Sequence, residues 1–347
     1  MTASLMDRVR DRAVAERIPI AVHFDLTYRC NERCVHCYLD HEDHGEMTTA
    51  EVRDVLDQLA AEGTLFLVFS GGELLLRKDF FELLAYARQL RFDVKIKTNA
   101  MLVTRPRAER IRDLGVRQVQ ISVYSHRPEV HDAITKVRGS LERTIAAIRF
   151  LRACGLKVTV ANVLMRQNAS DYHGVRALAA ELGADYTLDP TITPKMNGDT
   201  SIVALRMPQP QLLRLFKDSE VVGEGFCGVP ARADDETLDS VPCSAGHIAC
   251  YITPYGDVYP CVQFPLPSGN LRQQRFHDVW CDSPQLNEVR SIRVRDLTTC
   301  PSCTYVSNCT RCPGLAYMEG SMRGPSSADC EKSMLRAGAP GAGGTSP

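Results

Sequence analysis

The chain has 347 residues, a length that suggests about two domains. Its formal net charge is −1, so the overall field gives no reason to expect nucleic acid as a partner. No run of about 18 apolar residues occurs, which argues against a membrane-spanning helix. Residues 1–19 are charged, helical in pattern and without the apolar centre of a signal peptide, so we expect a cytoplasmic protein with reduced thiols.

Beyond residue 19, apolar strands alternate with segments of helical periodicity. The expected strands are 20–26, 64–73, 92–100, 116–125, 156–165 and 184–190. The expected helices between them are 48–63, 79–90, 107–115, 140–155 and 171–183. This alternation predicts an α/β fold with a parallel sheet and helical crossovers. Periodicity alone leaves two architectures open, a doubly wound sheet and a partial barrel.

Chemically capable residues follow the ends of several expected strands. Three cysteines follow the first strand, and the turn 70–73, Ser-Gly-Gly-Glu, ends the second. Asn99 lies at the end of the third strand and Ser122 near the end of the fourth. Because the carboxyl ends of parallel strands meet at one rim, we expect these residues to lie together.

The fourteen cysteines are unevenly placed along the chain. Cys30, Cys34 and Cys37 form a C-x3-C-x2-C triplet. A second group of eight consists of Cys243, Cys250, Cys261, Cys300, Cys303, Cys309, Cys312 and Cys330. In a cytosolic chain, clustered cysteines are typical of metal binding rather than of disulfides.

The triplet suits an iron–sulfur cluster with one open position. Such clusters are ordinarily held by four cysteines, so three thiolates leave one iron free for a small molecule. The alternative is a zinc site whose fourth ligand is His36 or His41. Zinc sites favour a cysteine pair followed by a distant second pair, and a compact triplet fits that pattern poorly.

The stretch CNERCVHCY after the first strand, together with SGGE after the second, resembles the radical S-adenosylmethionine (SAM) superfamily over residues 18–190. The resemblance implies a partial (β/α)6 barrel of the TIM type. It also implies a [4Fe–4S] cluster on Cys30, Cys34 and Cys37, whose open iron is chelated by the amino and carboxylate groups of SAM.

The same resemblance implies further contacts to SAM, from Gly71, Gly72, Glu73, Asn99, Ser122 and Tyr38. The two glycines would let the backbone approach the ligand closely. Glu73 would accept a hydrogen bond from the SAM amino group, while Asn99 and Ser122 would contact ribose or methionine. Tyr38 would pack near the adenine, the alternative being a simple core aromatic. Lys136 or Arg138 would supply the cation for the SAM carboxylate.

The second cysteine group resembles the SPASM extension of radical SAM enzymes, which carries two auxiliary [4Fe–4S] clusters. Eight cysteines make two complete four-thiolate sets. The family pattern assigns Cys243, Cys250, Cys261 and Cys312 to one cluster, and Cys300, Cys303, Cys309 and Cys330 to the other. A grouping by nearness along the chain would exchange Cys312 with Cys330. The alternative chemistry is a pair of structural zinc sites.

These features divide the chain into five segments. They are an N-terminal helical segment 1–19, a radical SAM core 20–190, a bridging region 191–242, an auxiliary-cluster extension 243–333 and a disordered tail 334–347. The bridging region is rich in proline, glycine and acidic residues, and we expect it to cross from the barrel to the extension and to cover the barrel mouth.

The resemblance implies reductive cleavage of SAM to a 5′-deoxyadenosyl radical, which abstracts a hydrogen atom from a substrate. The expected substrate is a ribosomally made peptide or protein that is oxidatively modified or crosslinked. A small molecule or a tetrapyrrole is the alternative substrate. Sulfatase maturation is disfavoured because Val262 stands where maturases commonly carry Asp. A zinc-binding, cysteine-rich interaction protein is the alternative from another class.

The expected partners follow from this chemistry. A flavodoxin- or ferredoxin-type protein would donate electrons. The first strand begins at about residue 20, which leaves no room for a winged-helix peptide-recognition domain, so we expect a separate recognition protein to deliver a peptide. No nucleic acid and no membrane are expected as partners.

Overall fold

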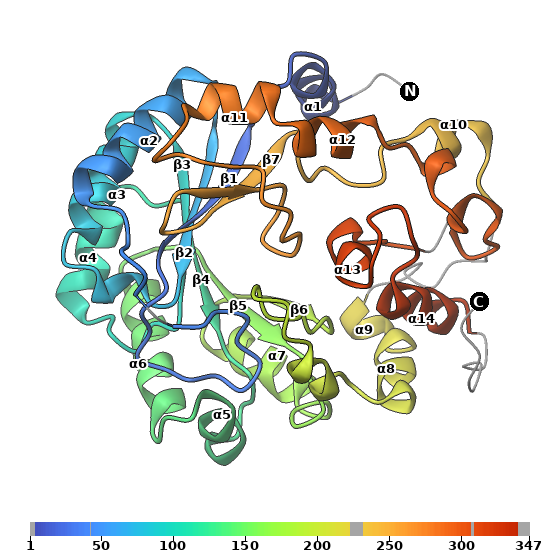
Figure 1. The fold of residues 1–347 in the computed structure, drawn as a ribbon. Helices are drawn as coiled ribbons and strands as arrows, with labels where there is room; N and C mark the ends of the chain where they lie inside the picture. The colour runs from blue at the N-terminus through green and yellow to red at the C-terminus, as the bar shows by residue number, and fades with distance from the viewer. Residues whose placement is uncertain (1–3, 42, 223–231, 307–308, 339–347) are drawn as a thin grey trace.

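The strands of the protein form one nine-stranded sheet in the order β6-β5-β4-β3-β2-β1-β7-β8-β9 (Figure 1). The computed structural model describes residues 4–41, 43–222, 232–306 and 309–338. No helix within these ranges is long and apolar enough to cross a membrane.

The first six strands are parallel and neighbour one another in chain order. They are β1 (Ala21–Thr27), β2 (Phe66–Gly71), β3 (Asp93–Thr98), β4 (Gln118–Ser122), β5 (Val158–Val163) and β6 (Asp185–Asp189). All six expected strands are therefore confirmed, within a few residues at each end. The curved parallel sheet confirms the partial barrel and excludes the doubly wound alternative, in which the strand order reverses.

Helices cover the outer face of this sheet (Figure 1). They are α2 (Thr49–Ala61), α3 (Phe80–Gln89), α4 (Arg105–Asp113), α6 (Ser140–Ala153) and α7 (Tyr172–Glu181), preceded by α1 (Leu5–Ala15) at the N-terminus. Helix α2 begins at Thr48, whose side chain and that of Glu51 form a reciprocal capping box. The sequence analysis missed α5 (Pro128–Thr135), a short helix that starts with a proline at its first turn.

The sheet is apolar toward the helices and polar toward the inside of the barrel. On β3, Val94 and Ile96 are buried in the main hydrophobic core, whereas Lys95 and Lys97 alternate with them and belong to the opposite face. Strand β4, with the sequence QVQIS, repeats the pattern. Because its inner face is polar, the barrel can hold a polar ligand.

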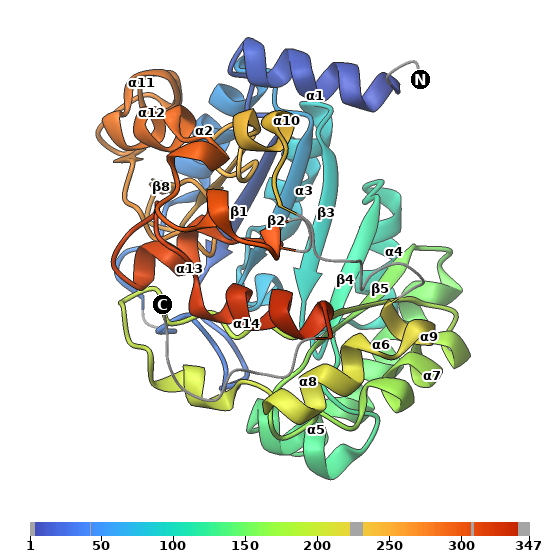
Figure 2. The same cartoon turned by 90° about the vertical axis from the view of Figure 1, so that its right-hand side faces the viewer.

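The C-terminal part of the chain extends the same sheet. Strand β7 (Ala249–Ile252) pairs with β1 in parallel, and β8 (Asp257–Tyr259) and β9 (Gly269–Asn270) follow antiparallel. The remaining helices are α8 (Gln209–Phe216), α9 (Ser219–Val222), α10 (Asp235–Asp239), α11 (Phe276–Asp282), α12 (Pro284–Ser291), α13 (Pro313–Met318) and α14 (Ser327–Arg336). Figure 2 shows α8 and α14 below α13, near the carboxyl ends of the core strands.

The bridging region 191–242 is partly helical in its described residues. Helix α8 packs in a small apolar cluster with Leu335 of α14, so the bridging region also contributes a hydrophobic contact to the C-terminal helix. Residues 223–231 lie outside the described residues. Helix α14 includes the first three residues of the expected tail 334–347, and residues 339–347 also lie outside the described ranges.

Arg77 ties the carboxyl end of β1 to the loop before α2. Its guanidinium donates to the carbonyls of Leu26 and Met47, at 2.8 Å each. It also forms an ion pair with Asp79, with an N–O distance of 2.8 Å. Arg77 is only 7% exposed, so these partners replace the water that a buried guanidinium loses.

Replacing Arg77 with Met should lower the free energy of unfolding by about 3 kcal/mol, because it leaves two buried carbonyls and Asp79 without their partner. Urea denaturation measures the change. The neighbouring exposed Lys78→Met removes the same charge and should change stability by less than about 0.5 kcal/mol. Equal effects of the two substitutions would contradict the structural role of Arg77.

Candidate functional site

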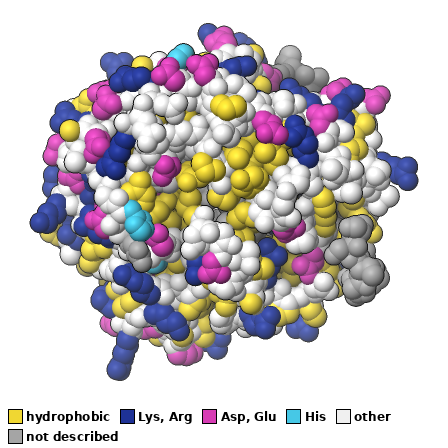
Figure 3. All heavy atoms as spheres, viewed as in Figure 1, with side chains coloured by type: hydrophobic (Ala, Val, Ile, Leu, Met, Phe, Trp, Pro, Cys, Tyr) yellow, Lys and Arg dark blue, Asp and Glu magenta, His cyan; other side chains and the backbone are white. Residues whose placement is uncertain are grey.

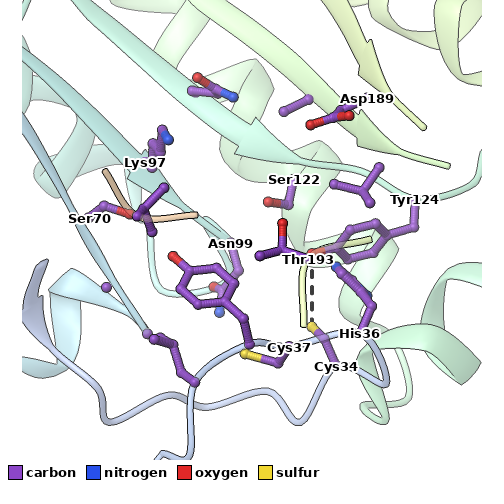
Figure 4. Close-up of a pocket in the computed structure, with 18 of the residues that line it drawn as sticks. Cys34, His36, Cys37, Ser70, Lys97, Asn99, Ser122, Tyr124, Asp189 and Thr193 are labelled. Carbon is purple, nitrogen blue, oxygen red and sulfur yellow. Dashed lines mark hydrogen bonds between the residues drawn. The ribbon is translucent and has the colours of Figure 1, made fainter. Parts of the chain in front are cut away.

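A cavity of about 540 Å³ lies at the carboxyl ends of the core strands (Figure 4). Residues of β1 to β6 and of the loops that follow them line it, and so do Val262 and Gln263 of the extension. Figure 3, in the orientation of Figure 1, shows hydrophobic side chains gathered at the centre of the face in view, with many of the charged side chains toward its periphery.

The cysteine triplet lies in the loop after β1. Cys30, Cys34 and Cys37 all line the cavity, so the structure brings the predicted ligands together. Two backbone hydrogen bonds fasten this loop to the end of α5, from Arg33 N to the carbonyl of Thr135 at 3.0 Å and from Val35 N to that of Ile134 at 3.0 Å. Helix α5 thus holds the cysteine loop in place.

The surroundings of the triplet disfavour free thiolates. Burial raises the pKa of Cys30 to about 12 and that of Cys37 to about 11, and the field of Cys37 raises the pKa values of Cys30 and Cys34 further. Ionised cysteines in this loop therefore need a cationic partner, which the iron of a cluster would supply. The backbone N–H of Glu32 points to Cys30 Sγ at 3.4 Å and favours the thiolate. The donor set therefore fits an iron–sulfur cluster.

The described residues contain no group of side chains placed to bind a single metal ion. No three side chains of His, Cys, Asp or Glu in these ranges are grouped closely enough to hold one ion. His36 and His41, the candidate fourth zinc ligands, also line the cavity. Cys30, Cys34 and Cys37 line the same cavity, and their C-x3-C-x2-C spacing suits the separate corners of a cubane better than the paired ligands of a zinc site.

The glycine turn after β2 packs against the end of β1. Gly71 has φ +134°, and a Cβ on it would collide with the carbonyl oxygen of Thr27. A Cβ on Gly72 would collide with the carbonyl oxygen of Arg29. Both glycines line the cavity, so their small size serves the contact between two backbone segments as well as the approach of a ligand.

Glu73 is fully buried and lies behind the cavity wall rather than among the residues that line it. Its carboxylate accepts hydrogen bonds from the hydroxyl of Thr98 at 2.7 Å, from Asn99 N at 3.0 Å and from Leu75 N at 3.1 Å. Burial raises its pKa, although these donors oppose the shift. Glu73 thus fixes the carboxyl end of β3.

Three further predicted SAM contacts, Asn99, Ser122 and Tyr38, line the cavity. Asn99 donates from Nδ2 to Asn31 Oδ1 at 2.7 Å and lies 3.7 Å from Cys30 Sγ, which places it beside the triplet. Ser122 ends β4 and faces the cavity (Figure 4). Tyr38 is half-buried, and its backbone carbonyl accepts from Met196 N at 3.1 Å. Lys136 and Arg138, the candidate cations, are exposed and do not line it.

His36 is a site residue that the sequence analysis considered only for zinc. Its ring packs edge-on against Tyr124, with centroids 4.7 Å apart. Its buried Nδ1 has no hydrogen-bond partner among the described residues. Burial lowers its pKa to about 4. Its position between Cys34 and Cys37 is the feature of the sequence that could have identified it as a residue of the cavity.

The eight cysteines of the extension fall into two neighbourhoods. Burial raises the pKa values of Cys250, Cys261 and Cys312; the field of Cys243 contributes at Cys261, and that of Cys261 contributes at Cys250 and Cys312. Burial raises the pKa of Cys330 to about 11, and the fields of Cys309, Cys300 and Cys303 raise it further. This division supports the interleaved sets expected from the family pattern, which stay a prediction.

Comparisons with known proteins agree with this geometry. A model of the radical SAM superfamily matches residues 24–179, and a model of an iron–sulfur cluster-binding domain, SPASM, matches residues 243–313. Mycofactocin maturase MftC of Mycobacterium tuberculosis is 30% identical over 84% of this chain and 77% of its own length. AdoMet-dependent heme synthase of Methanosarcina barkeri is 28% identical over 78% and 85%, and PqqA peptide cyclase of Xanthomonas campestris is 32% identical over 76% and 73%.

A solved structure confirms the fold. Streptococcus suis SuiB, bound to S-adenosylmethionine, superposes with a TM-score of 0.73 at 19% identity, over 93% of this chain and 80% of SuiB. The chain belongs to the radical SAM superfamily and carries a C-terminal SPASM domain. It is an enzyme whose cofactors are a [4Fe–4S] cluster, SAM and auxiliary iron–sulfur clusters.

Replacing Glu73 with Ala should weaken SAM binding roughly tenfold, which corresponds to about 1.4 kcal/mol. The reason is indirect: the buried carboxylate holds the hydroxyl of Thr98 and Asn99 N, so its loss loosens Asn99, a predicted SAM contact that lines the cavity. Titration calorimetry on the iron-reconstituted protein measures the affinity. The exposed Glu82→Ala on α3 is the control, and an unchanged SAM affinity would remove Glu73 from the site.

We propose that the auxiliary ligands interleave, with Cys312 joining the upstream set and Cys330 the downstream set. Cys312→Ala should then alter the same electron paramagnetic resonance signal as Cys243→Ala, whereas Cys330→Ala should alter the signal lost in Cys309→Ala. The reason is that removing one of four thiolates changes only the cluster it holds. A Cys312→Ala spectrum that matches Cys309→Ala would establish the local grouping instead.

Proposed function

We propose that the protein oxidatively modifies or crosslinks a ribosomally made peptide or protein. The observation that carries this proposal is the continuity of the cavity, which reaches from the cysteine triplet to Val262 and Gln263 beside Cys261. A substrate held there lies between the SAM-binding loop and an auxiliary ligand, as an oxidation requires. The relatives MftC and PqqA peptide cyclase support a peptide as the substrate.

When bound, the SAM cluster supplies the electron that splits SAM into methionine and a 5′-deoxyadenosyl radical, which removes a hydrogen atom from the substrate. The chain's own part is to bind and orient. Cys30, Cys34 and Cys37 would hold the cluster, and the Gly71–Gly72 backbone would lie along SAM. The unpartnered Nδ1 of His36, set between two of these cysteines, suits a hydrogen-bond donor on the adenine.

A buried polar network joins β1 to β7 beside the cavity. The hydroxyl of Tyr251 on β7 donates to Asp25 on β1 at 2.7 Å, and the hydroxyl of Tyr28 lies 2.7 Å from that of Tyr251. His23, which lines the cavity, has its Nε2 3.0 Å from the same carboxylate. Asp25 and Tyr251 are completely buried, so the network ties the core to the extension through partnered polar groups.

A tetrapyrrole is the second candidate substrate, because a heme synthase is among the relatives at 28% identity. We further propose that a flavodoxin- or ferredoxin-type protein donates electrons, that a separate protein presents the peptide, and that the enzyme is cytoplasmic. The free state of every cysteine within the described residues fits a reducing compartment.

Anaerobic reconstitution followed by reduction with dithionite in the presence of SAM tests the enzyme. Cys30→Ala, Cys34→Ala and Cys37→Ala should each abolish formation of 5′-deoxyadenosine, while the auxiliary clusters keep their visible absorption. The triplet and the extension cysteines belong to separate predicted ligand sets, so the SAM cluster can be lost while the auxiliary clusters remain bound.

Cys154→Ala is the matched control, since Cys154 caps helix α6 away from the cavity and its loss should leave cleavage unchanged. Wild-type rates of 5′-deoxyadenosine formation in any triplet variant would refute the assignment. A colourless reconstituted protein that holds zinc would favour the interaction-protein alternative.

A further inference from the structure

Lys97 is the one Lys or Arg among the described residues that line the cavity. It occupies the fifth position of β3, on the polar inner face of the barrel, and is half-buried. In Figure 4 it lies on the strand side of the cavity, with Cys34 and Cys37 on the opposite side. Its ammonium forms no ion pair and no hydrogen bond with any residue in the described ranges.

The carboxylates near Lys97 are already engaged. Asp25 accepts from Tyr251, with His23 at its other oxygen, and Asp189 accepts from Thr191 N at 2.8 Å. The fields of Asp25, Cys261 and Asp189 favour the ammonium of Lys97, but burial outweighs them and lowers its pKa. An anion that enters the cavity would meet an ammonium that has no ion-pair partner among the described residues.

Lys95 provides an internal comparison. It lies two residues before Lys97 on the same strand and the same face, and it is also half-buried. It does not line the cavity. A lysine on this face of β3 therefore does not always reach the cavity. Lys97 differs from Lys95 in lying nearer the carboxyl end of the strand, where the cavity is.

We propose that Lys97 anchors the substrate by binding a carboxylate through its ammonium, on the side of the cavity opposite the cysteine triplet. This inference deepens the proposed function and rests on it. The carboxylate is either the C-terminus of a peptide or an acidic side chain, since both present the same two oxygens to an ammonium. Anchoring at this depth would fix which residue of the substrate faces SAM, because the anchor and the triplet lie on opposite walls.

Binding of acetylated tripeptides to the reconstituted, SAM-loaded enzyme tests the proposal. Acetyl-Ala-Ala-Ala with a free carboxylate is compared with its C-terminal amide, and acetyl-Ala-Glu-Ala amide with its Gln counterpart. The first pair reports a terminal carboxylate and the second an acidic side chain. Equilibrium dialysis measures the four affinities.

In the wild type and in Lys95→Met, at least one acid should bind roughly tenfold more tightly than its neutral partner, which corresponds to about 1.4 kcal/mol. In Lys97→Met this preference should fall to less than about twofold, because the neutral side chain of similar length cannot pair with the anion. Lys97→Gln replaces Lys97→Met if the latter does not retain its clusters.

Equal binding of acids and neutral partners by the wild type would overturn the proposal, and so would a preference that survives in Lys97→Met. The proposal would also be overturned if Lys97→Met shifted the redox potential of an auxiliary cluster but kept the acid preference. The ammonium of Lys97 would then act on the surroundings of Cys261 rather than on the substrate. Formation of 5′-deoxyadenosine by the wild type is measured separately. Its absence contradicts the proposed function, whereas its presence without acid preference contradicts the anchor alone.

Discussion

Strand β1 forms backbone hydrogen bonds on both edges, with β2 on one side and β7 on the other, and the arrangement of the site depends on this double pairing. Its carboxyl end leads into the cysteine triplet. Its pairing with β7 places Cys250 within the sheet, and the β7–β8 hairpin returns the chain to Cys261. One strand thereby brings the cysteine triplet and the two residues after Cys261, Val262 and Gln263, to the same cavity.

The inside of the barrel is polar because the core strands divide their side chains by face. Val94 and Ile96 pack against the outer helices, and the intervening lysines belong to the inner face. Burying polar groups is costly unless they are partnered, and Asp25 and Tyr251 satisfy each other. Lys95 and Lys97 have no such partner among the described residues, and of the two only Lys97 lines the cavity.

The start of the cysteine loop after β1 and the glycine turn after β2 lie against each other, although they are about 40 residues apart in the chain. Gly72 N donates to the carbonyl of Thr27 at 2.8 Å, and Glu73 N donates to that of Arg29 at 2.9 Å. These bonds continue the β1–β2 ladder past the ends of the strands and bring the glycine turn against the start of the cysteine loop. Any side chain larger than hydrogen at either glycine would push the two loops apart.

The sequence by itself determined the six-stranded α/β core and showed the two groups of clustered cysteines, because strand and helix periods and cysteine spacing are local properties. The division of the extension cysteines into two ligand sets stays a prediction. The alternation of lysines within 93–98 was also visible, and it is the signal that could have found Lys97. Only the tertiary structure decided that β7 joins β1 in parallel, that Glu73 lies behind the cavity wall and that α5 supports the triplet. Asp25 and Tyr251 are 226 residues apart, and a contact over that separation depends on the packing of the whole chain and leaves no pattern within any short segment.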